Sequence, residues 1–195
     1  MLSTRYREAA AGVSLIESML ALAVSAIVLV NGVPSLGRWV RDLEVRNSAS
    51  SVHAALQAAR AEAVSRNTLV RLELGDAQGH TGWRLSCVRI SAQCPATIRQ
   101  QPAGDANGVR WAASSLSDTP ALGTPLAVGV GMPASISFDA LGTAPGIASG
   151  TEVARVDVFH KDSVAEGRLV VQVSALGIAR ICNPAAASGH SEECR

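Results

Sequence analysis

Net charge is nearly absent from this sequence. It contains 17 basic and 16 acidic residues, so the formal net charge is +1 at pH 7. The chain as a whole therefore has no electrostatic field that would draw it to nucleic acid or to lipid headgroups. Affinity for an anionic partner would have to come from a local group of basic side chains.

Motifs of catalysis are also missing. The sequence contains no glycine-rich phosphate loop, no HExxH helix and no nucleophile elbow. Cys182, His190 and Cys194 could be imagined as a zinc site, but they lack a CxxC pair and a fourth ligand. We therefore expect no enzymatic activity, no metal and no cofactor.

The sequence does contain one long apolar run. It extends from Val13 to Val33, covers 21 residues and includes a single charged residue, Glu17. A helix of this length would be about 30 Å long, close to the thickness of the hydrocarbon core of a bilayer. A charge inside such a segment costs about 2.5–3.5 kcal/mol at mid-membrane and less near an end. Glu17 is therefore expected to have a function.

The flanks of this run do not form an ordinary secretory signal. Arg5 and Arg7 precede the run and favour a cytoplasmic amino terminus, although Arg38 and Arg41 beyond it weaken that asymmetry. The run is longer than the roughly 7–15 apolar residues of a signal peptide, and no small-x-small cleavage site follows it. A plain single-pass anchor is one interpretation.

Gly12 followed by VSLIE resembles the class III leader of type IV pilins and type II secretion pseudopilins. In that family a prepilin peptidase cuts after a glycine, and the fifth mature residue is a glutamate. With Val13 as the first mature residue, Glu17 is the fifth and Pro34 the twenty-second, where many pilins carry a helix-breaking proline. One departure is Val13 itself, because the first mature residue is usually phenylalanine.

The resemblance implies a role for these residues. Residues 1–12 are a leader that is removed between Gly12 and Val13, after which the amino group of Val13 is methylated. In the filament, Glu17 neutralises the terminal amine of a neighbouring subunit and sets the axial register. Either charge alone would be costly inside an apolar bundle of helices.

A long helix is predicted from this point to Asn67. Residues 13–34 form its membrane-spanning assembly half, with a kink at Gly32 and Pro34, since proline removes a backbone donor. Residues 35–67 form an amphipathic half that packs on a domain. The apolar stripe of this second half consists of Ala49, Val52, Leu56, Ala59 and Ala63.

From residue 68 onward the apolar pattern has a period of two, which is typical of strands. The alternating segments are TLVRLELGD, WRLSCVRI, SISFDALG, RVDVFHK and RLVVQVSALG. Residues 92–133 are rich in Gly, Pro, Ser and Ala and are expected to be mostly loop, with short strands at GVRWAA and PLAVGV. Residues 68–195 therefore predict an antiparallel β domain packed on the helix, which is an α+β fold.

Two parts of this region indicate which group of pilins the chain resembles. HAALQAARAEAVSRNTLVRL resembles the helix-to-strand segment by which FimT- and GspH-type minor pilins are known. SISFDALG and LVVQVSALGIARICNP resemble the later strands and carboxy-terminal region of that family. The resemblance implies a pilin-like fold, and the terminal cysteine pair is more similar to the FimT branch than to the GspH branch.

The four cysteines all lie beyond the apolar run, which suits an oxidising compartment. Four cysteines allow three pairings. We predict Cys87–Cys94 and Cys182–Cys194, because each pair closes a short loop. Free thiols are the alternative.

The favoured function is that of a minor pilin in the assembly and priming of a type IV pilus, at the pilus tip. The chain would be a single-pass inner-membrane protein with a periplasmic domain. Its partners would be the prepilin peptidase and other major and minor pilins or pseudopilins. A pseudopilin of the GspH type, in a type II secretion system, is an alternative that shares every amino-terminal feature.

A second alternative is a DNA-uptake pilin that binds double-stranded DNA. Some FimT-like proteins are associated with DNA uptake through a Gly-Arg-x-Arg motif near the carboxy terminus. The corresponding segment here is GIAR, in which Arg180 matches and Ile178 does not. Arg180 and Arg195 are the candidate DNA-binding residues, and binding is expected to be weak because affinity grows with the number of phosphates neutralised.

Overall fold

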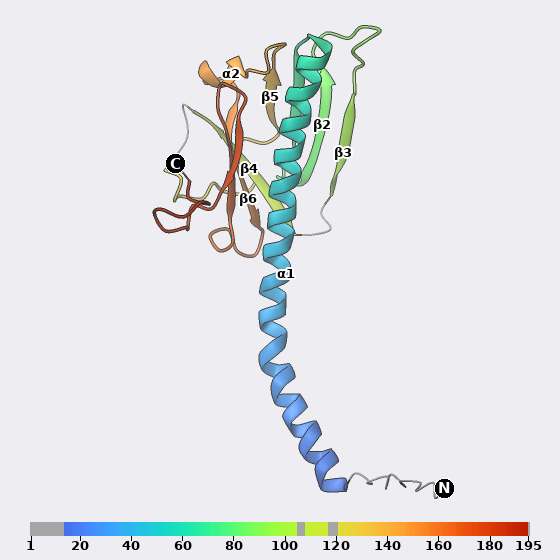
Figure 1. Cartoon of the computed structure of the whole chain (residues 1–195), viewed down its shortest axis with the longest axis vertical. Helices are drawn as coiled ribbons and strands as arrows, with labels where there is room; N and C mark the ends of the chain where they lie inside the picture. Colours follow the sequence, from blue (N-terminus) through green and yellow to red (C-terminus); the bar gives the residue numbers. More distant parts are fainter. Residues whose placement is uncertain (1–13, 105–107, 117–120, 195) are drawn as a thin grey trace, which may run out of the picture. The chain divides into compact units, whose positions relative to one another are not determined.

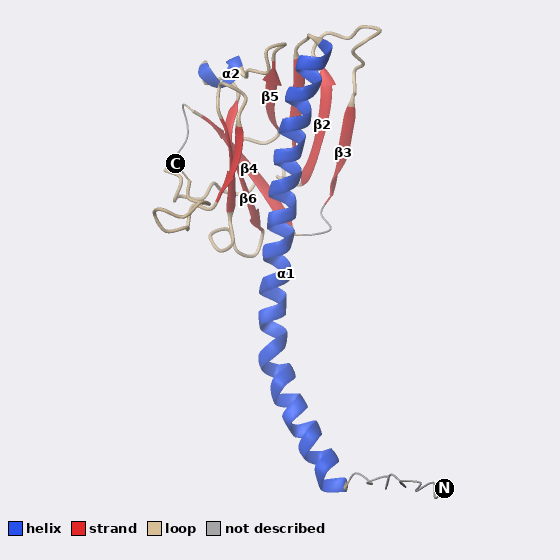
Figure 2. Ribbon diagram, in the orientation of Figure 1, coloured by secondary structure: helices blue, strands red, loops and turns tan. Residues whose placement is uncertain are grey.

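The computed structural model describes residues 14–104, 108–116 and 121–194, without the side chains of residues 28–35. The chain divides into two compact units, Met1–Val40 and Arg41–Arg195. Figures 1 and 2 show the helices and strands. These are α1 (Leu15–Arg66), β1 (Val70–Leu74), β2 (Thr81–Cys87), β3 (Arg99–Gly104), β4 (Val109–Ser115), β5 (Ala134–Phe138), α2 (Pro145–Ala148), β6 (Val153–His160), β7 (Leu169–Val173) and β8 (Ala179–Cys182).

The described part of the first unit is the first part of α1. The helix continues through Gly32 and Pro34, but their side chains lie outside the described residues, so the expected kink stays a prediction. Over the residues that the structure describes, no helical segment is both long and apolar enough to cross a membrane.

The second unit begins with the rest of α1, which is amphipathic. All five residues of the predicted stripe are buried, together with Val45. The helix ends at Arg66, next to the predicted end at Asn67. Asn67 has a φ of 48°, and asparagine is one of the few side chains that adopt this left-handed conformation readily at a helix end.

The strands form two antiparallel four-stranded sheets. The strand orders are β3-β2-β1-β5 and β4-β6-β7-β8. One core cluster contains side chains from α1 and from both sheets, so α1 covers the inner faces of the two sheets together. The α+β fold predicted from the sequence, a helix packed against antiparallel sheet, is confirmed.

Two tryptophans connect the sheets to α1 through hydrogen bonds. Trp111 of β4 is 1% exposed, and its indole N–H donates to Ser48 Oγ at 2.9 Å. Trp83 of β2 donates to Ser51 Oγ at 3.3 Å. His53 of α1 lies 3.3 Å from the carbonyl oxygen of Ala179 in β8. Since buried polar groups need partners, these bonds fix α1 against both sheets.

The segment between Ala92 and Pro133 differs from its prediction in two ways. GVRWAA forms a strand, β4, as expected, but a further strand, β3, precedes it and PLAVGV forms no strand. Instead, the loop that contains PLAVGV covers the outer face of β6, where Leu126 packs against Ala112 and Phe159. As a result, the first seven residues of β6 are buried on both faces, where alternation had suggested one exposed face.

Candidate functional site

The predicted cleavage site, Gly12 and Val13, lies outside the described residues. The first described residue, Ser14, caps α1: its Oγ accepts the backbone N–H of Glu17 at 3.2 Å, and its carbonyl accepts that of Ser18 at 3.1 Å. Ser-x-x-Glu is the sequence of a capping box, which satisfies free N–H groups at a helix start. The sequence prediction missed Ser14, although this spacing could have revealed it.

Glu17 is exposed and lies in the first turn of α1. A carboxylate there is favoured by the positive end of the helix dipole. Large apolar side chains cover one side of the helix along this segment, and they too are exposed: Leu15, Ile16, Met19, Leu20, Leu22, Val24 and Ile27. Glu17 lies on the other side, together with Ser18, Ala21 and Ser25. An exposed apolar surface of this size normally contacts lipid or other protein surfaces, so this segment combines one carboxylate with a surface that is unfavourable in water.

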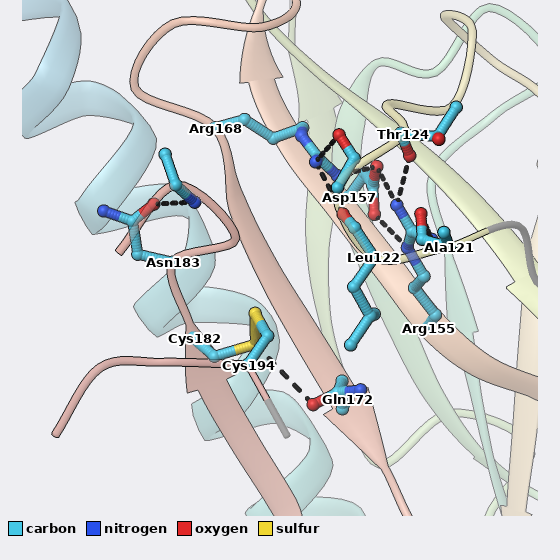
Figure 3. Close-up of a disulfide and its surroundings, with 12 residues drawn as sticks. Ala121, Leu122, Thr124, Arg155, Asp157, Arg168, Gln172, Cys182, Asn183 and Cys194 are labelled. Carbon is cyan, nitrogen blue, oxygen red and sulfur yellow. Dashed lines mark hydrogen bonds and ion pairs between the residues drawn. A yellow bond between two sulfur atoms is a disulfide. The ribbon is translucent and has the colours of Figure 1, made fainter. Parts of the chain in front are cut away.

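The predicted carboxy-terminal site is formed by β7, β8 and the tail. Arg180 is exposed on β8 and lies opposite Gln172 of β7. Cys182 is bonded to Cys194, and the Cys182 sulfur lies 3.6 Å from Gln172 Oε1 (Figure 3). Arg195 lies outside the described residues, so its position relative to Arg180 stays a prediction.

The tail returns to the end of β8, where Asn183 and Glu193 form an isolated parallel bridge. The N–H of Asn183 donates to the carbonyl of Glu192 at 2.7 Å, which places the tail beside the edge strand. Together they line a polar pocket of 580 Å³, formed by Gln172, Arg180, Ile181, Cys182, Gly189, His190, Ser191 and Glu193. Arg180 shares this pocket with the carboxylate of Glu193, which lowers the attraction of the pocket for an anion.

The second disulfide has the other expected pairing, Cys87–Cys94. Cys94 is buried, and the loop between the cysteines is closed by hydrogen bonds between the backbones of Ser91 and Cys94. The guanidinium of Arg66 donates to the carbonyl of Gln93, so the end of α1 also contacts this loop. Since Cys182 and Cys194 are bonded to each other, they are not ligands of a metal.

A buried ion cluster was not predicted from the sequence. The carboxylate of Asp157 on β6 is bound by Arg155 Nε at 2.6 Å and by Arg168 Nη1 at 2.6 Å. The same two guanidinium groups donate to the carbonyls of Leu122 and Thr124, both at 2.7–2.8 Å. Figure 3 shows the three side chains between β6 and this loop. The cluster holds the loop on the outer face of β6.

Loss of the carboxy-terminal disulfide is expected to destabilise the second unit. The double substitution Cys182→Ser with Cys194→Ser should lower the free energy of unfolding by about 3 kcal/mol, because the chain-entropy model gives about that value for a loop of this size. Denaturation of the detergent-solubilised chain, followed by tryptophan fluorescence, measures the change. Ser188→Ala, an exposed change in the same loop, should leave the transition in place.

Peptide mapping without reductant provides the independent check of the pairing. The expected fragments contain Cys87 with Cys94 and Cys182 with Cys194. A crossed pair, such as Cys87 with Cys182, or four thiols that alkylate in protein from the periplasm would contradict the assignment.

Comparison with known proteins identifies the family. The family model "Type II transport protein GspH" matches residues 48–177, which is more than half of the chain. No curated protein is similar enough to count as a match.

Solved structures of pilin-like proteins are also similar to this chain. The type IV minor pilin FimU of Pseudomonas aeruginosa has 20% identity and a TM-score of 0.49, over 75% of this chain and 93% of that one. The minor pseudopilin EpsH of the Vibrio cholerae type 2 secretion system has 12% identity and a TM-score of 0.45, over 73% and 99%. Since the family model covers the end of α1 and the strands β1 to β7, the chain belongs to the GspH family of pilin-like minor subunits.

Proposed function

We propose that this chain is a minor pilin that takes part in the assembly and priming of a type IV pilus, at the pilus tip. The observation that carries the proposal is the start of α1, where a capped helix presents one exposed carboxylate, Glu17, beside exposed apolar side chains. Such a surface is stable only when lipid or other helices cover it. Assembly among other pilin-like helices provides that cover.

The same segment is expected to be processed before assembly. A prepilin peptidase removes residues 1–12, and the new terminal amine of Val13 is methylated. Before assembly, residues 13–34 cross the inner membrane and the second unit lies in the periplasm. The two disulfides support this location, because disulfides persist in oxidising compartments. The chain acts as a structural subunit and not as an enzyme.

Membership of the GspH family also supports a pseudopilin of type II secretion, because the matching model describes a type II transport protein. The amino-terminal segment suits either machine. The exposed Arg180 supports the other alternative, capture of double-stranded DNA, but with Ile178 in place of a second arginine and Glu193 in the same pocket this support is weaker.

A deletion strain separates these functions. Pilus number, secretion of type II substrates and transformation frequency are measured with and without the wild-type gene in trans. Loss of pili supports the proposal, and loss of secretion with normal pili supports the pseudopilin. Loss of transformation with normal pili supports DNA capture. If none of the three changes, the chain is not required for any of these machines.

A further inference from the structure

The start of α1 is fixed by one residue. Leu15 is the first helical residue, and Ser14 directly before it binds the first turn through both its side chain and its backbone. Ser14 Oγ accepts the N–H of Glu17 at 3.2 Å. The Ser14 carbonyl accepts the N–H of Ser18 at 3.1 Å and the hydroxyl of Ser18 at 3.4 Å. Ser14 is therefore the N-cap of α1, the residue that separates the helix from what precedes it.

The bond to Ser14 Oγ competes with a longer helix. In an α-helix each N–H donates to the carbonyl four residues earlier. If α1 began one residue earlier, the N–H of Glu17 would therefore donate to the carbonyl of Val13. Ser14 Oγ accepts this N–H instead. The serine side chain thus opposes extension of the helix towards the amino terminus, in addition to capping it.

The sequence before Ser14 favours such an extension. Residues 7–11 are REAAA, and alanine, arginine and glutamate are among the strongest helix formers. On the other side of Ser14, α1 continues for 52 residues. Between these two segments, Gly12 has a low helix propensity and Ser14 is a preferred N-cap. These two residues favour an interruption of the helix at this point.

The bond that the leader peptidase would cut lies at this interruption. In leader removal, water adds to the carbonyl carbon of Gly12, the C–N bond to Val13 breaks, and a proton from the water passes to the nitrogen of Val13. If the helix included this bond, the carbonyl of Gly12 would accept the N–H of Ile16, and the helical turn would enclose it. Hydrolysis requires a carbonyl that the enzyme can reach and polarise, so it requires this bond outside the helix.

We propose that Ser14 is a positioning residue for leader removal. Its cap starts α1 at Leu15, so the Gly12–Val13 bond stays outside the helix and can enter the active site of the prepilin peptidase. This inference rests on the proposed function, which supplies the peptidase and the cleavage site. Ser14 takes no part in the chemistry. It sets the fraction of the chain that can be cut, and the apparent affinity for the peptidase scales with that fraction.

The test measures leader removal from the full chain, in detergent micelles, by a purified prepilin peptidase. Replacing a serine N-cap with alanine typically shifts the capped equilibrium by about fivefold. Ser14→Ala should therefore raise KM by about two- to fivefold and leave kcat unchanged. Ser14→Asn should have the wild-type KM, because asparagine caps a helix as well as serine does.

Ser25→Ala is the matched control. The Ser25 hydroxyl donates to the carbonyl of Ala21 at 2.7 Å inside α1, so this variant also loses a serine hydroxyl that is bonded to the helix. Because Ser25 lies far from the cut in the sequence and caps no helix end, its KM should equal that of the wild-type chain.

Carbon-13 chemical shifts of the uncut chain in the same micelles show where the helix begins. Ser14→Ala should move its start towards Gly12, and Ser14→Asn should leave it in place. Wild-type KM or an unchanged helix start for Ser14→Ala would overturn the inference. Equally slow cleavage of Ser14→Ala and Ser14→Asn would also overturn it, because the peptidase would then recognise the serine itself. If the wild-type chain is not cut after Gly12, the proposed function fails. If it is cut there and Ser14→Ala is cut equally well, only the role of Ser14 fails.

Discussion

Glu17→Ala is expected to leave membrane insertion and leader removal intact but to exclude the chain from filaments. Insertion should not suffer, because the substitution makes the segment more apolar. In the filament, the terminal amine of the neighbouring subunit would lose its partner in an apolar bundle. An unpartnered buried charge costs about 3–5 kcal/mol, and about 1.4 kcal/mol corresponds to tenfold. The amount in sheared filaments should therefore fall about a hundredfold or more.

Glu17→Gln separates charge from helix capping. Glutamine has a similar shape and can serve in a capping box as glutamate does, while the bond from the Glu17 N–H to Ser14 remains possible in both variants. If the negative charge sets the register, Glu17→Gln should be excluded as strongly as Glu17→Ala. Quantitative immunoblots of membrane and filament fractions give both values. Wild-type levels of either variant in filaments would show that charge pairing does not control assembly.

Asp157→Ala should produce the largest loss of stability in the second unit. Asp157 is fully buried between Arg155 and Arg168, and it also accepts the N–H of Leu126 at 3.1 Å. Without the carboxylate, two buried guanidinium groups face each other with carbonyl partners alone. Breaking a buried ion pair by removing one partner costs about 3–5 kcal/mol, so the free energy of unfolding should fall by that amount.

Denaturant titration of the detergent-solubilised chain measures this loss. Asp162→Ala is the matched control, because the side chain of Asp162 is 66% exposed and lies 3.5 Å from His160. Its effect should stay within about 0.5 kcal/mol, as for most surface substitutions. A loss below about 1 kcal/mol for Asp157→Ala would show that solvent or a rearranged loop compensates for the missing carboxylate.

Local patterns were sufficient to predict much of the fold. The spacing of Ala49, Val52 and Leu56 indicated the buried side of α1, and the alternation of Val70, Leu72 and Leu74 indicated a half-buried strand. Both signals are visible in the sequence because one face of each element is apolar and the other polar. The same residues are fully or almost fully buried in the structure.

The covered face of β6 could not be predicted in this way. Arg155 and Asp157 alternate with Val156 and Val158, and charged residues in such a pattern usually face water. The loop that buries them comes from residues more than 30 positions earlier in the chain, and it carries no period of its own. The position of the loop depends on ion pairs and hydrogen bonds between residues far apart in the sequence. Such contacts cannot be predicted from the residue pattern of a single sequence.

For the candidate site too, some features could be predicted from the sequence and others could not. The two cysteine pairs could be predicted from their spacing in the sequence. The roles of Glu17 and Pro34, which the family resemblance implies, stay predictions. The contact between the turn after β5 and the turn between β7 and β8 could not be predicted, because these turns lie far apart in the sequence. There the N–H of Ala144 donates to the carbonyl of Ala175 at 2.8 Å, and the backbones of Gly142 and Gly177 are in contact.

The intact mass of the chain recovered from the filament fraction tests the central claim most directly. A processed pilin-like subunit should begin at Val13 and carry one added methyl group, and its mass should show two disulfides before reduction. The same species should be present in the inner membrane before assembly. A chain that retains Met1, that begins anywhere beyond Val33, or that never enters the filament fraction would contradict the account.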